Sequence, residues 1–370
     1  MEEEKEKGGI PDKAMPTVDV WTRLSETKKP IIMYGMGDGA EKILAVMERY
    51  GITPADFMAS DEFVRGHSFK GHRVKKLSEI EELYKDFIVV ICFGTALPEV
   101  MENIMRISEK YETVAPDVPV IGEGLFDSDY VSDHEFEIMR LKMILADDKS
   151  RDCLDSIMKY RISGDLGTLR ECETPKSEMT EMLEINGTET YVDLGAYDGD
   201  TVEEFLKYTG KRFQKIYALE PDRRSFTKLR RRLYYISSAL LDARNAAAWN
   251  ENTTLMFYNK AGRSSSFTAN ISAQTKGRGY ETQAITVDSL LDGKPATLIK
   301  YDVEGSEREA LLGSEQTIRM YRPRLVVSLY HRVGDIIELP LLVHELNPDY
   351  RLFMRHHPYI PAWDTNLYCI

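Results

Sequence analysis

The chain of 370 residues lacks the patterns that mark several common classes of protein. Its four cysteines are widely spaced without a Cys-x-x-Cys pair, and no His-x-x-x-His pair occurs, so neither a zinc site nor a disulfide framework is indicated. No run of about 18 apolar residues is present, which argues against a membrane-spanning helix. The acidic start, MEEEKEKGGIPDK, lacks the hydrophobic core of a signal peptide. We therefore expect a cytoplasmic protein with reduced cysteines.

Positive charge is also scarce. The formal net charge of −13 argues against a nucleic-acid binder, because such proteins neutralise phosphates with an excess of lysine and arginine. One basic run, at 223–232, stands out, but apolar residues recur beside it at helical spacing. A solvated helix face is therefore favoured over a patch for an acidic substrate. The expected partner is a small-molecule or glycan acceptor, without nucleic acid or a membrane span, and a homodimer is left open.

Residues 191–201, with the sequence YVDLGAYDGDT, form the most informative pattern that is present. They predict a buried strand that ends at Asp193, a turn at Gly195 and Gly199, and a helix that begins near Asp200. Glycines in such a turn let a ligand approach the backbone, because no Cβ is in the way. The helix N-terminus supplies free N–H groups. The glycines alone would equally suit a plain tight turn.

An acidic residue ends the next predicted strand. Glu220 follows the apolar run 216–219 and lies 27 residues after Asp193. Nucleotide-binding α/β sheets hold ribose hydroxyls with an acid at this place. The order of strand, glycine turn, helix, strand and acid favours a ligand site. The spacing D-x-G-x-x-x-G resembles the S-adenosylmethionine (SAM) site of class I methyltransferases more than a G-x-G-x-x-G dinucleotide site.

The N-terminal part predicts a second α/β unit. A strand at 30–34 leads into Gly35-x-Gly37-x-x-Ala40, a helix to Tyr50 and a second strand that ends at Asp61. This arrangement resembles the dinucleotide fingerprint, so Gly35, Gly37 and Asp61 are candidates for a second nucleotide site. The alternative is a structural or substrate-presenting role. Further helices (77–84 and 97–111), a strand (87–93) and a last strand near 118–121 would complete a small doubly wound sheet.

Four segments follow from these patterns: an acidic tail and lead-in (1–28), a Rossmann-like domain (29–128), a helical connector (129–185) and a larger α/β domain (186–370). In the connector, Tyr160 and Arg161 could reach a substrate, although core and surface roles are favoured. The larger domain predicts a third strand at 242–249 that carries Asn245, an added pair at 253–258 and 282–287, and a polar loop at 261–267. Two buried strands (297–302 and 324–330) and a final antiparallel pair (350–355 and 366–370) follow.

Residues from about 188 to 370 resemble the FkbM family of SAM-dependent methyltransferases. The shared motifs are VDLGAYDGDT, LEPD, the Asn245-x-Ala247 element, IKYDVEGSEREALLG at 299–313 and RPRLVVSLYH at 322–331. The resemblance implies a class I methyltransferase sheet, mostly parallel with its last strand antiparallel. Many members of the family have an acid shortly before the histidine that ends the strand, where this chain has Ser328-Leu-Tyr-His331.

The resemblance also implies the residues of the SAM site. Gly195 and Gly199 would lie under the methionine end, Glu220 would hold the ribose hydroxyls and Asn245 would meet the adenine edge. The full set implied by the family is Asp193, Gly195, Tyr197, Asp198, Gly199, Glu220, Pro221, Asn245, Ala246 and Asp302.

The chemistry of methyl transfer suggests further roles. The transfer is an in-line displacement on an activated donor, so the enzyme has mainly to align acceptor and methyl carbon. A hydroxyl acceptor also needs a base. We expect His331 to be this base, because its unperturbed pKa of about 6.5 lies nearest neutrality, with Asp302 as the next candidate. A histidine hydrogen-bonded within a loop, and an aspartate that orders the SAM amino group, are the alternatives.

No metal site is predicted. Asp302 and Glu304 offer oxygen ligands that would suit magnesium, but the sequence supplies no further ligand. The favoured function is O-methylation of a hydroxyl on a sugar, glycoconjugate or related small molecule, with SAM as the cofactor. The alternatives are a module that binds SAM or a nucleotide-sugar without methyl transfer, and an NAD-dependent oxidoreductase built on the N-terminal turn.

Overall fold

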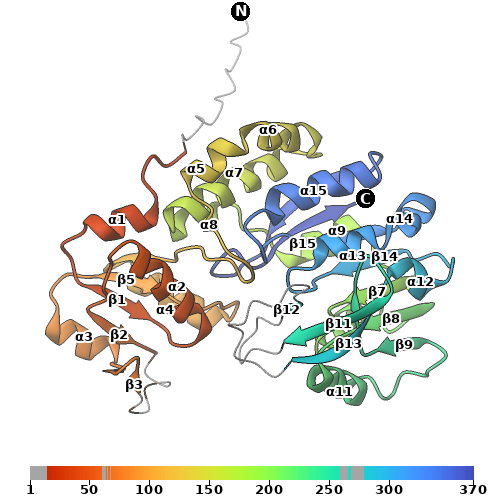
Figure 1. Cartoon of the computed structure of the whole chain (residues 1–370), viewed down its shortest axis with the longest axis horizontal. Coiled ribbons are helices and arrows are strands. Elements are labelled where there is room, and N and C mark those ends of the chain that lie inside the picture. The colour runs from red at the N-terminus through yellow and green to blue at the C-terminus, as the bar shows by residue number, and fades with distance from the viewer. Residues whose placement is uncertain (1–14, 61–63, 65, 67, 259–265, 268–278) are drawn as a thin grey trace, which may run out of the picture.

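The computed structural model describes residues 15–60, 64, 66, 68–258, 266–267 and 279–370. Two α/β units lie side by side, with helices of the middle segment across their junction (Figure 1). Asp61 of the predicted second nucleotide site lies outside the described residues, as does most of the predicted polar loop at 261–267. Among the described residues, no helix is long and apolar enough to cross a membrane.

The N-terminal unit is built on a parallel sheet in the order β2-β1-β5-β6. Its strands are β1 (Ile31–Tyr34), β2 (Asp56–Met58), β5 (Ile88–Ile91) and β6 (Glu112–Val114). The two central strands, β1 and β5, are short apolar runs buried on both faces, as expected for a parallel sheet covered by helices. A small hairpin of β3 (Ser68–Phe69) and β4 (His72–Arg73) lies beside them.

Alternation along β1 divides this unit into two cores. Ile31 and Met33 pack with the buried faces of α1 (Val20–Glu26) and α2 (Asp38–Arg49). Ile32 and Tyr34 share the larger core with buried residues of α3 (Leu77–Leu83) and α4 (Pro98–Ser108). The sheet is therefore wound on both faces, as the sequence predicts.

The prediction of the last N-terminal strand is wrong. The structure places it at β6 (Glu112–Val114), whereas the segment at 118–121 is irregular. Pro116 and Pro119 explain the difference, because proline lacks the N–H that a strand donates to its neighbour. The apolar residues there serve packing instead, since Val118 and Val120 are both buried.

The C-terminal unit has a seven-stranded sheet in the order β16-β17-β15-β14-β7-β8-β9. Only β17 runs against the others, so the prediction of a parallel sheet with an antiparallel last strand is confirmed. The strands are β7 (Thr190–Leu194), β8 (Lys215–Leu219), β9 (Leu241–Arg244), β14 (Leu298–Tyr301), β15 (Arg324–Ser328), β16 (Leu352–His356) and β17 (Thr365–Cys369).

The predicted strand at 242–249 is in fact two strands in different sheets. β9 ends at Arg244, and β10 (Ala246–Ala248) pairs with β13 (Gly279–Ile285) in a second sheet. Asn245 lies at the break between them. The predicted added pair is confirmed, because β11 (Thr253–Tyr258) runs antiparallel to β13. A short strand, β12 (Ser266–Phe267), completes that sheet.

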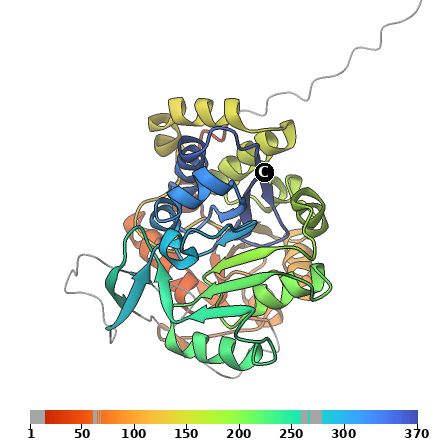
Figure 2. The same ribbon diagram turned by 90° about the vertical axis from the view of Figure 1, so that its right-hand side faces the viewer.

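Helices cover both faces of the large sheet (Figure 2). One core contains buried residues of α9 (Lys176–Leu183), α10 (Asp200–Tyr208) and α11 (Arg223–Arg232). The other contains those of α12 (Val287–Leu291), α13 (Glu307–Leu312), α14 (Glu315–Tyr321) and α15 (Asp335–Leu346). This second core continues through α6 (Glu135–Ile144), α7 (Asp148–Ser163) and α8 (Leu166–Glu171) into the N-terminal unit, while α5 (Ser128–Asp133) contacts α6.

Tyr160 and Arg161 of α7 join the two units. Neither residue lines the cavity of about 700 Å³ that lies at the edge of the large sheet. The Tyr160 hydroxyl donates to the carbonyl of Ala115 at 2.9 Å, and the Arg161 guanidinium lies 2.6 Å from the Asp117 carboxylate. Arg161 also donates to the carbonyl of Val333 in the C-terminal unit. Both residues are therefore buried structural links.

Candidate active site at the edge of the large sheet

A cavity of about 700 Å³ lies at the carboxyl edge of the large sheet. Its floor includes the ends of β7 and β14, which are neighbours in the sheet although their connections run to opposite sides. Open α/β sheets bind ligands at such a point, because the two diverging connections leave a crevice. The volume falls in the range of ordinary ligand sites.

The glycine turn after β7 forms one wall of this cavity. Gly195 has a positive φ of 82°, and a Cβ there would lie 1.9 Å from the carbonyl oxygen of Asp302. Glycine is therefore required for packing between the ends of β7 and β14, in addition to any approach of a ligand. Tyr197, with φ 44°, is also in the left-handed region. A non-glycine residue adopts this conformation at a cost, and such residues concentrate at functional sites.

Glu220 holds this turn against the end of β8. Its two carboxylate oxygens accept the backbone N–H of Tyr197 at 2.9 Å and of Asp222 at 2.7 Å. Asn245 supports the same corner, because its amide donates to the carbonyls of Glu220 and Pro221. The residues that the sequence assigns to the ribose and the adenine thus come together at one corner.

The residues expected at the SAM site fall into two groups. Those that line the cavity are Gly195, Tyr197, Glu220, Pro221, Ala246 and Asp302. Asp193, Asp198, Gly199 and Asn245 lie behind them. Asp198 pairs with Arg232 at 2.6 Å, and Gly199 begins α10 with φ 90°. Asp193 is fully buried and accepts a hydrogen bond from Thr201.

Lys300 and Asp302 form the middle of the cavity. The Lys300 ammonium lies 2.9 Å from Asp302 Oδ2 and 3.9 Å from Asp193 Oδ1. The other oxygen of Asp302 accepts from the hydroxyls of Ser328 at 3.1 Å and Tyr330 at 3.0 Å. Asp302 is therefore fixed from both sides.

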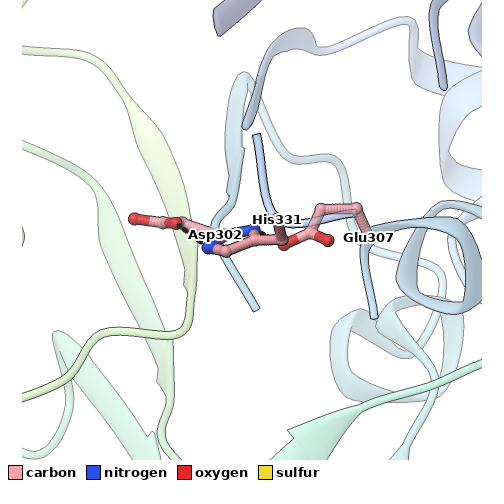
Figure 3. Close-up of side chains that lie close together, drawn as sticks. All are labelled: Asp302, Glu307 and His331. Carbon is pink, nitrogen blue, oxygen red and sulfur yellow. Dashed lines mark ion pairs between the residues drawn. The ribbon is translucent and has the colours of Figure 1, made fainter. Parts of the chain in front are cut away.

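His331 lies next to Asp302 and is surrounded by carboxylates (Figure 3). Its Nδ1 is 2.9 Å from Glu307 Oε1, and its Nε2 is 3.6 Å from Asp302 Oδ1 and 3.8 Å from Glu304 Oε2. Glu307 is itself buried and accepts the backbone N–H of Val303 at 2.8 Å. The structure therefore brings the two predicted catalytic residues together and adds Glu304 and Glu307 to them.

Comparison with known proteins identifies this domain. Residues 193–361 match the family model of the methyltransferase FkbM domain. The C-terminal unit is an FkbM methyltransferase domain. No curated protein matches the chain.

The solved structures extend the likeness to the whole fold. Methyltransferase FkbM from Methylobacillus flagellatus KT matches with a TM-score of 0.70 at 20% identity, over 92% of this chain and 90% of that chain. Fibrillarin from Aeropyrum pernix with bound SAM matches at 10% identity and TM-score 0.32, over 50% of this chain and 68% of that one. An rRNA methylase from Streptococcus thermophilus matches at 13% identity and TM-score 0.33, over 53% and 95%. The fold is α/β with a class I methyltransferase sheet, and the first match includes the N-terminal unit.

In this methyltransferase domain the carboxylates change the protonation of His331. Burial alone would lower the pKa of its imidazole, but Glu307, Glu304 and Asp302 overcome that effect and raise the pKa to about 10. Burial would likewise raise the pKa of Asp302, but Lys300 and His331 hold it well below its usual range. These carboxylates therefore favour the protonated imidazolium of His331 at neutral pH, and in that form the side chain cannot accept a proton.

Glu304 is, like Glu220, an acid of this cavity whose pKa is raised from its usual range. Burial raises its pKa to about 7, while the positive charge of His331 opposes the rise. The side chain is 44% exposed, so screening by water draws the value back toward that of an ordinary carboxyl. Glu304 also has a positive φ of 53°, in the turn after β14. It is the second cavity residue, with Tyr197, that holds this conformation without being glycine.

Asp302, Glu307 and His331 are close enough together to suggest a metal site. However, Glu307 and Asp302 face opposite nitrogens of the imidazole, and one ion cannot bind both edges of a ring. Asp302 is also occupied by Lys300, Ser328 and Tyr330. A protonated His331 satisfies these carboxylates without an ion, so we derive no step through a metal.

Sequence reasoning missed several residues that line the cavity. Lys300 is one of them, in β14 two residues before Asp302, with which it pairs. Tyr359, Trp363 and Asp364 also line the cavity. They lie in an irregular segment between β16 and β17, where no periodic pattern marks them. Gly35 and Gly37 of the N-terminal turn do not line it.

Proposed function

We propose that the chain is a SAM-dependent methyltransferase that acts on a hydroxyl of a sugar, glycoconjugate or related small molecule. One observation carries this proposal. A single cavity is lined by the turn of Gly195 and Tyr197, by Glu220, and by Glu304 and His331, and Asp302 adjoins both Gly195 and His331. Such a cavity can hold a donor and an acceptor next to each other.

The donor half suits SAM. Glu220 has carboxylate lone pairs for two ribose hydroxyls, and its corner is fixed before any ligand binds. Burial raises the pKa of Glu220 to about 8, partly opposed by the two N–H donors. Hydroxyl donors from a ribose would stabilise its charged form. The sulfonium of SAM would meet a site rich in carboxylates, and it supplies an already activated methyl group.

The acceptor half must remove a proton as the new bond forms. A hydroxyl near His331 could accept a hydrogen bond from the imidazolium Nε2–H, which would stabilise the developing negative charge on its oxygen. Glu304 would then take the proton, since burial raises its pKa from the usual range toward neutrality and its side chain reaches the cavity. His331 as the base is the alternative. It requires the positive charge of the sulfonium to lower the pKa of the imidazolium, so that His331 loses its proton to water before the methyl transfer.

Titration calorimetry with SAM tests the donor half. The wild-type protein should bind SAM, and Glu220→Gln should weaken binding by at least tenfold, the loss of one charge-assisted pair of hydrogen bonds. Gly195→Val is a poor variant for this purpose, because a Cβ there strikes the Asp302 carbonyl and would disturb the fold. Glu345→Gln, at an exposed site on α15, is the matched control.

Transfer of labelled methyl from SAM to a panel of pyranosides and glycolipids tests the reaction itself. Absence of SAM binding by the folded protein would refute the proposal. Binding of SAM without transfer to any member of the panel would favour a SAM-binding module without activity. We also propose that the chain works in the cytoplasm, because its four cysteines are free in the structure.

A further inference from the structure

The N-terminal sheet has a crevice of the same kind as the one that forms the active site. Its connections diverge between β1 and β5, and a glycine turn, residues 35–39, follows β1. In open α/β sheets this is the position of a nucleotide. A cavity beside Gly39 and Phe93 measures about 10 Å³, roughly enough for one water molecule and far below the size of a nucleotide site.

Part of this crevice is closed by the turn itself. A Cβ on Gly35 would lie 2.6 Å from the ring of Phe93, and a Cβ on Gly39 would lie 2.4 Å from the carbonyl oxygen of Cys92. The glycines therefore allow the turn to pack directly on the end of β5. They do not leave an open cradle between these two residues and β5.

The remainder is filled by the methyltransferase domain. Pro361 and Trp363, from the segment between β16 and β17, line what is left of the crevice. A Cβ on Gly94 would lie 2.6 Å from the Trp363 ring, so only glycine lets the indole come this close. Thr95 and Ile360 exchange backbone hydrogen bonds of 2.8 and 3.0 Å beside it. The segment 359–363 is thus fastened to the end of β5.

The same segment forms a wall of the active-site cavity. Tyr359 and Trp363 line it, with ring centroids 6.4 Å apart. Asp364 follows and pairs with Lys176 of α9 at 3.2 Å, and both also line the cavity. The indole N–H of Trp363 is buried and has no acceptor among the described residues. An aromatic wall next to polar side chains is therefore presented to the cavity.

A second contact from the N-terminal unit reaches the catalytic group. The backbone N–H of Ile121 donates to the carbonyl of His331 at 2.9 Å. Val120 lines the cavity, and its carbonyl accepts from Lys42 of α2 at 2.7 Å. The N-terminal unit thus touches the acceptor half at two places, through Thr95 and through Ile121.

We propose that the N-terminal domain is a positioning element of the acceptor site, and that the segment 359–363, seated in its crevice, is the wall against which a sugar ring packs. The C–H face of a pyranose fits an aromatic wall, while its hydroxyls fit Asp364, Lys176 and the Trp363 N–H. This inference rests on the proposed methyl transfer. It assigns Gly35 and Gly39 to the packing of the turn rather than to a nucleotide, while Gly37 is favoured as glycine by its φ of 112° alone.

Gly94→Ala tests the wall with methyl pyranosides as the acceptors. The added Cβ should push Trp363 into the cavity and lower kcat/KM by about 10²-fold, as a displacement of about 1 Å can, while the Kd for SAM stays within about twofold. Trp363→Phe lacks the two indole atoms that the new Cβ would strike but also the indole N–H, and the Tyr359 hydroxyl still lies 3.0 Å from that Cβ, so the double variant should recover only part of the loss. Gly167→Ala, at an exposed position of α8, is the control and should leave both quantities unchanged.

Unchanged transfer in Gly94→Ala, or a loss that Trp363→Phe does not reduce, would overturn the role of the wall. SAM binding without transfer to any pyranoside would overturn the acceptor class. Absence of SAM binding would instead contradict the proposed function. A second measurement adds NAD or UDP-glucose to the SAM-saturated protein, and no heat is expected. Binding that is lost in Gly37→Ala would show an open N-terminal site and would refute the filled crevice.

Discussion

The chain contains two crevices of the same construction, and only one of them is open. In the N-terminal sheet a Cβ on Gly39 would strike the carbonyl of Cys92, and in the methyltransferase sheet a Cβ on Gly195 would strike that of Asp302. Both glycine turns are thus packed against the neighbouring strand, at the place in each sheet where the connections diverge. Yet one crevice retains about 700 Å³ and the other about 10 Å³. A glycine turn after a strand is therefore a requirement of this fold, and a ligand site needs space and polar groups in addition.

The largest expected effect is a loss of turnover in a variant of the open crevice. Glu304→Gln should lower turnover by about 10²- to 10⁴-fold, the usual contribution of a positioned base, with SAM affinity nearly unchanged. Because Glu304 must be a carboxylate to accept the proton, wild-type turnover should rise with pH up to about 7. It should fall again near pH 10, where His331 loses its proton. Initial rates from pH 5 to 10.5 measure both limbs.

Glu48→Gln, at an exposed position of α2 in the N-terminal unit, is the counterpart control and should leave turnover unchanged. The opposite outcome for Glu304 and His331 would support His331 as the base, as expected from the sequence. If Glu304→Gln keeps normal turnover and His331→Gln abolishes it together with the rise near neutrality, the proton goes to His331, and the sulfonium must lower the pKa of that histidine.

The next largest effect is expected on the free energy of unfolding, at the buried junction between the two units. Arg161→Ala should lower the free energy of unfolding by about 3–5 kcal/mol, because it leaves the buried Asp117 carboxylate without its partner. Denaturant unfolding measures the change. Arg319→Ala removes an exposed pair with Glu315 on α14 and should cost only about 0.3–0.5 kcal/mol. Similar small losses in both variants would mean that the junction contributes little to stability.

The smallest expected effect is on amide exchange, and it tests whether the two sheets unfold as one unit. SAM at 100 times its Kd should stabilise the protein by about 2.7 kcal/mol. Amide exchange in β1 and β5 should slow by the same amount as exchange in β7 and β14, because the larger core runs through both sheets. Protection confined to the methyltransferase domain would show that the N-terminal domain opens independently, and would weaken its role in positioning the acceptor wall.

Most of the regular structure could be predicted from the sequence. Buried parallel strands are short apolar runs with turn residues at their ends, and β1, β5, β7, β14 and β15 all show this pattern. The predicted strands are wrong where the structure depends on something other than the local apolar pattern. Pro116 and Pro119 exclude a strand despite apolar neighbours. The run 242–249 reads as continuous, but the chain changes sheets at Asn245, whose amide binds the carbonyls at the end of β8.

The candidate site was predictable only in part. Glu220, Asp302 and His331 follow strands directly, so their place at one sheet edge could be inferred from the order of elements. Glu307 was overlooked, although its carboxylate decides the charge state of His331 from a distance of 2.9 Å. A pKa depends on every charge within several ångströms, and those neighbours come from different strands and helices.

The sequence by itself determined the two sheets, the family of the second one and the motif residues that lie at its carboxyl edge, because local periodicity and motif spacing encode these features. Only the tertiary structure decided that one crevice is open and the other filled, that three carboxylates surround His331, and that Tyr359 and Trp363 line the large cavity. These are properties of contacts between residues far apart in the chain, such as Gly94 with Trp363 and Thr95 with Ile360. No local pattern specifies such contacts, since they depend on how whole elements pack.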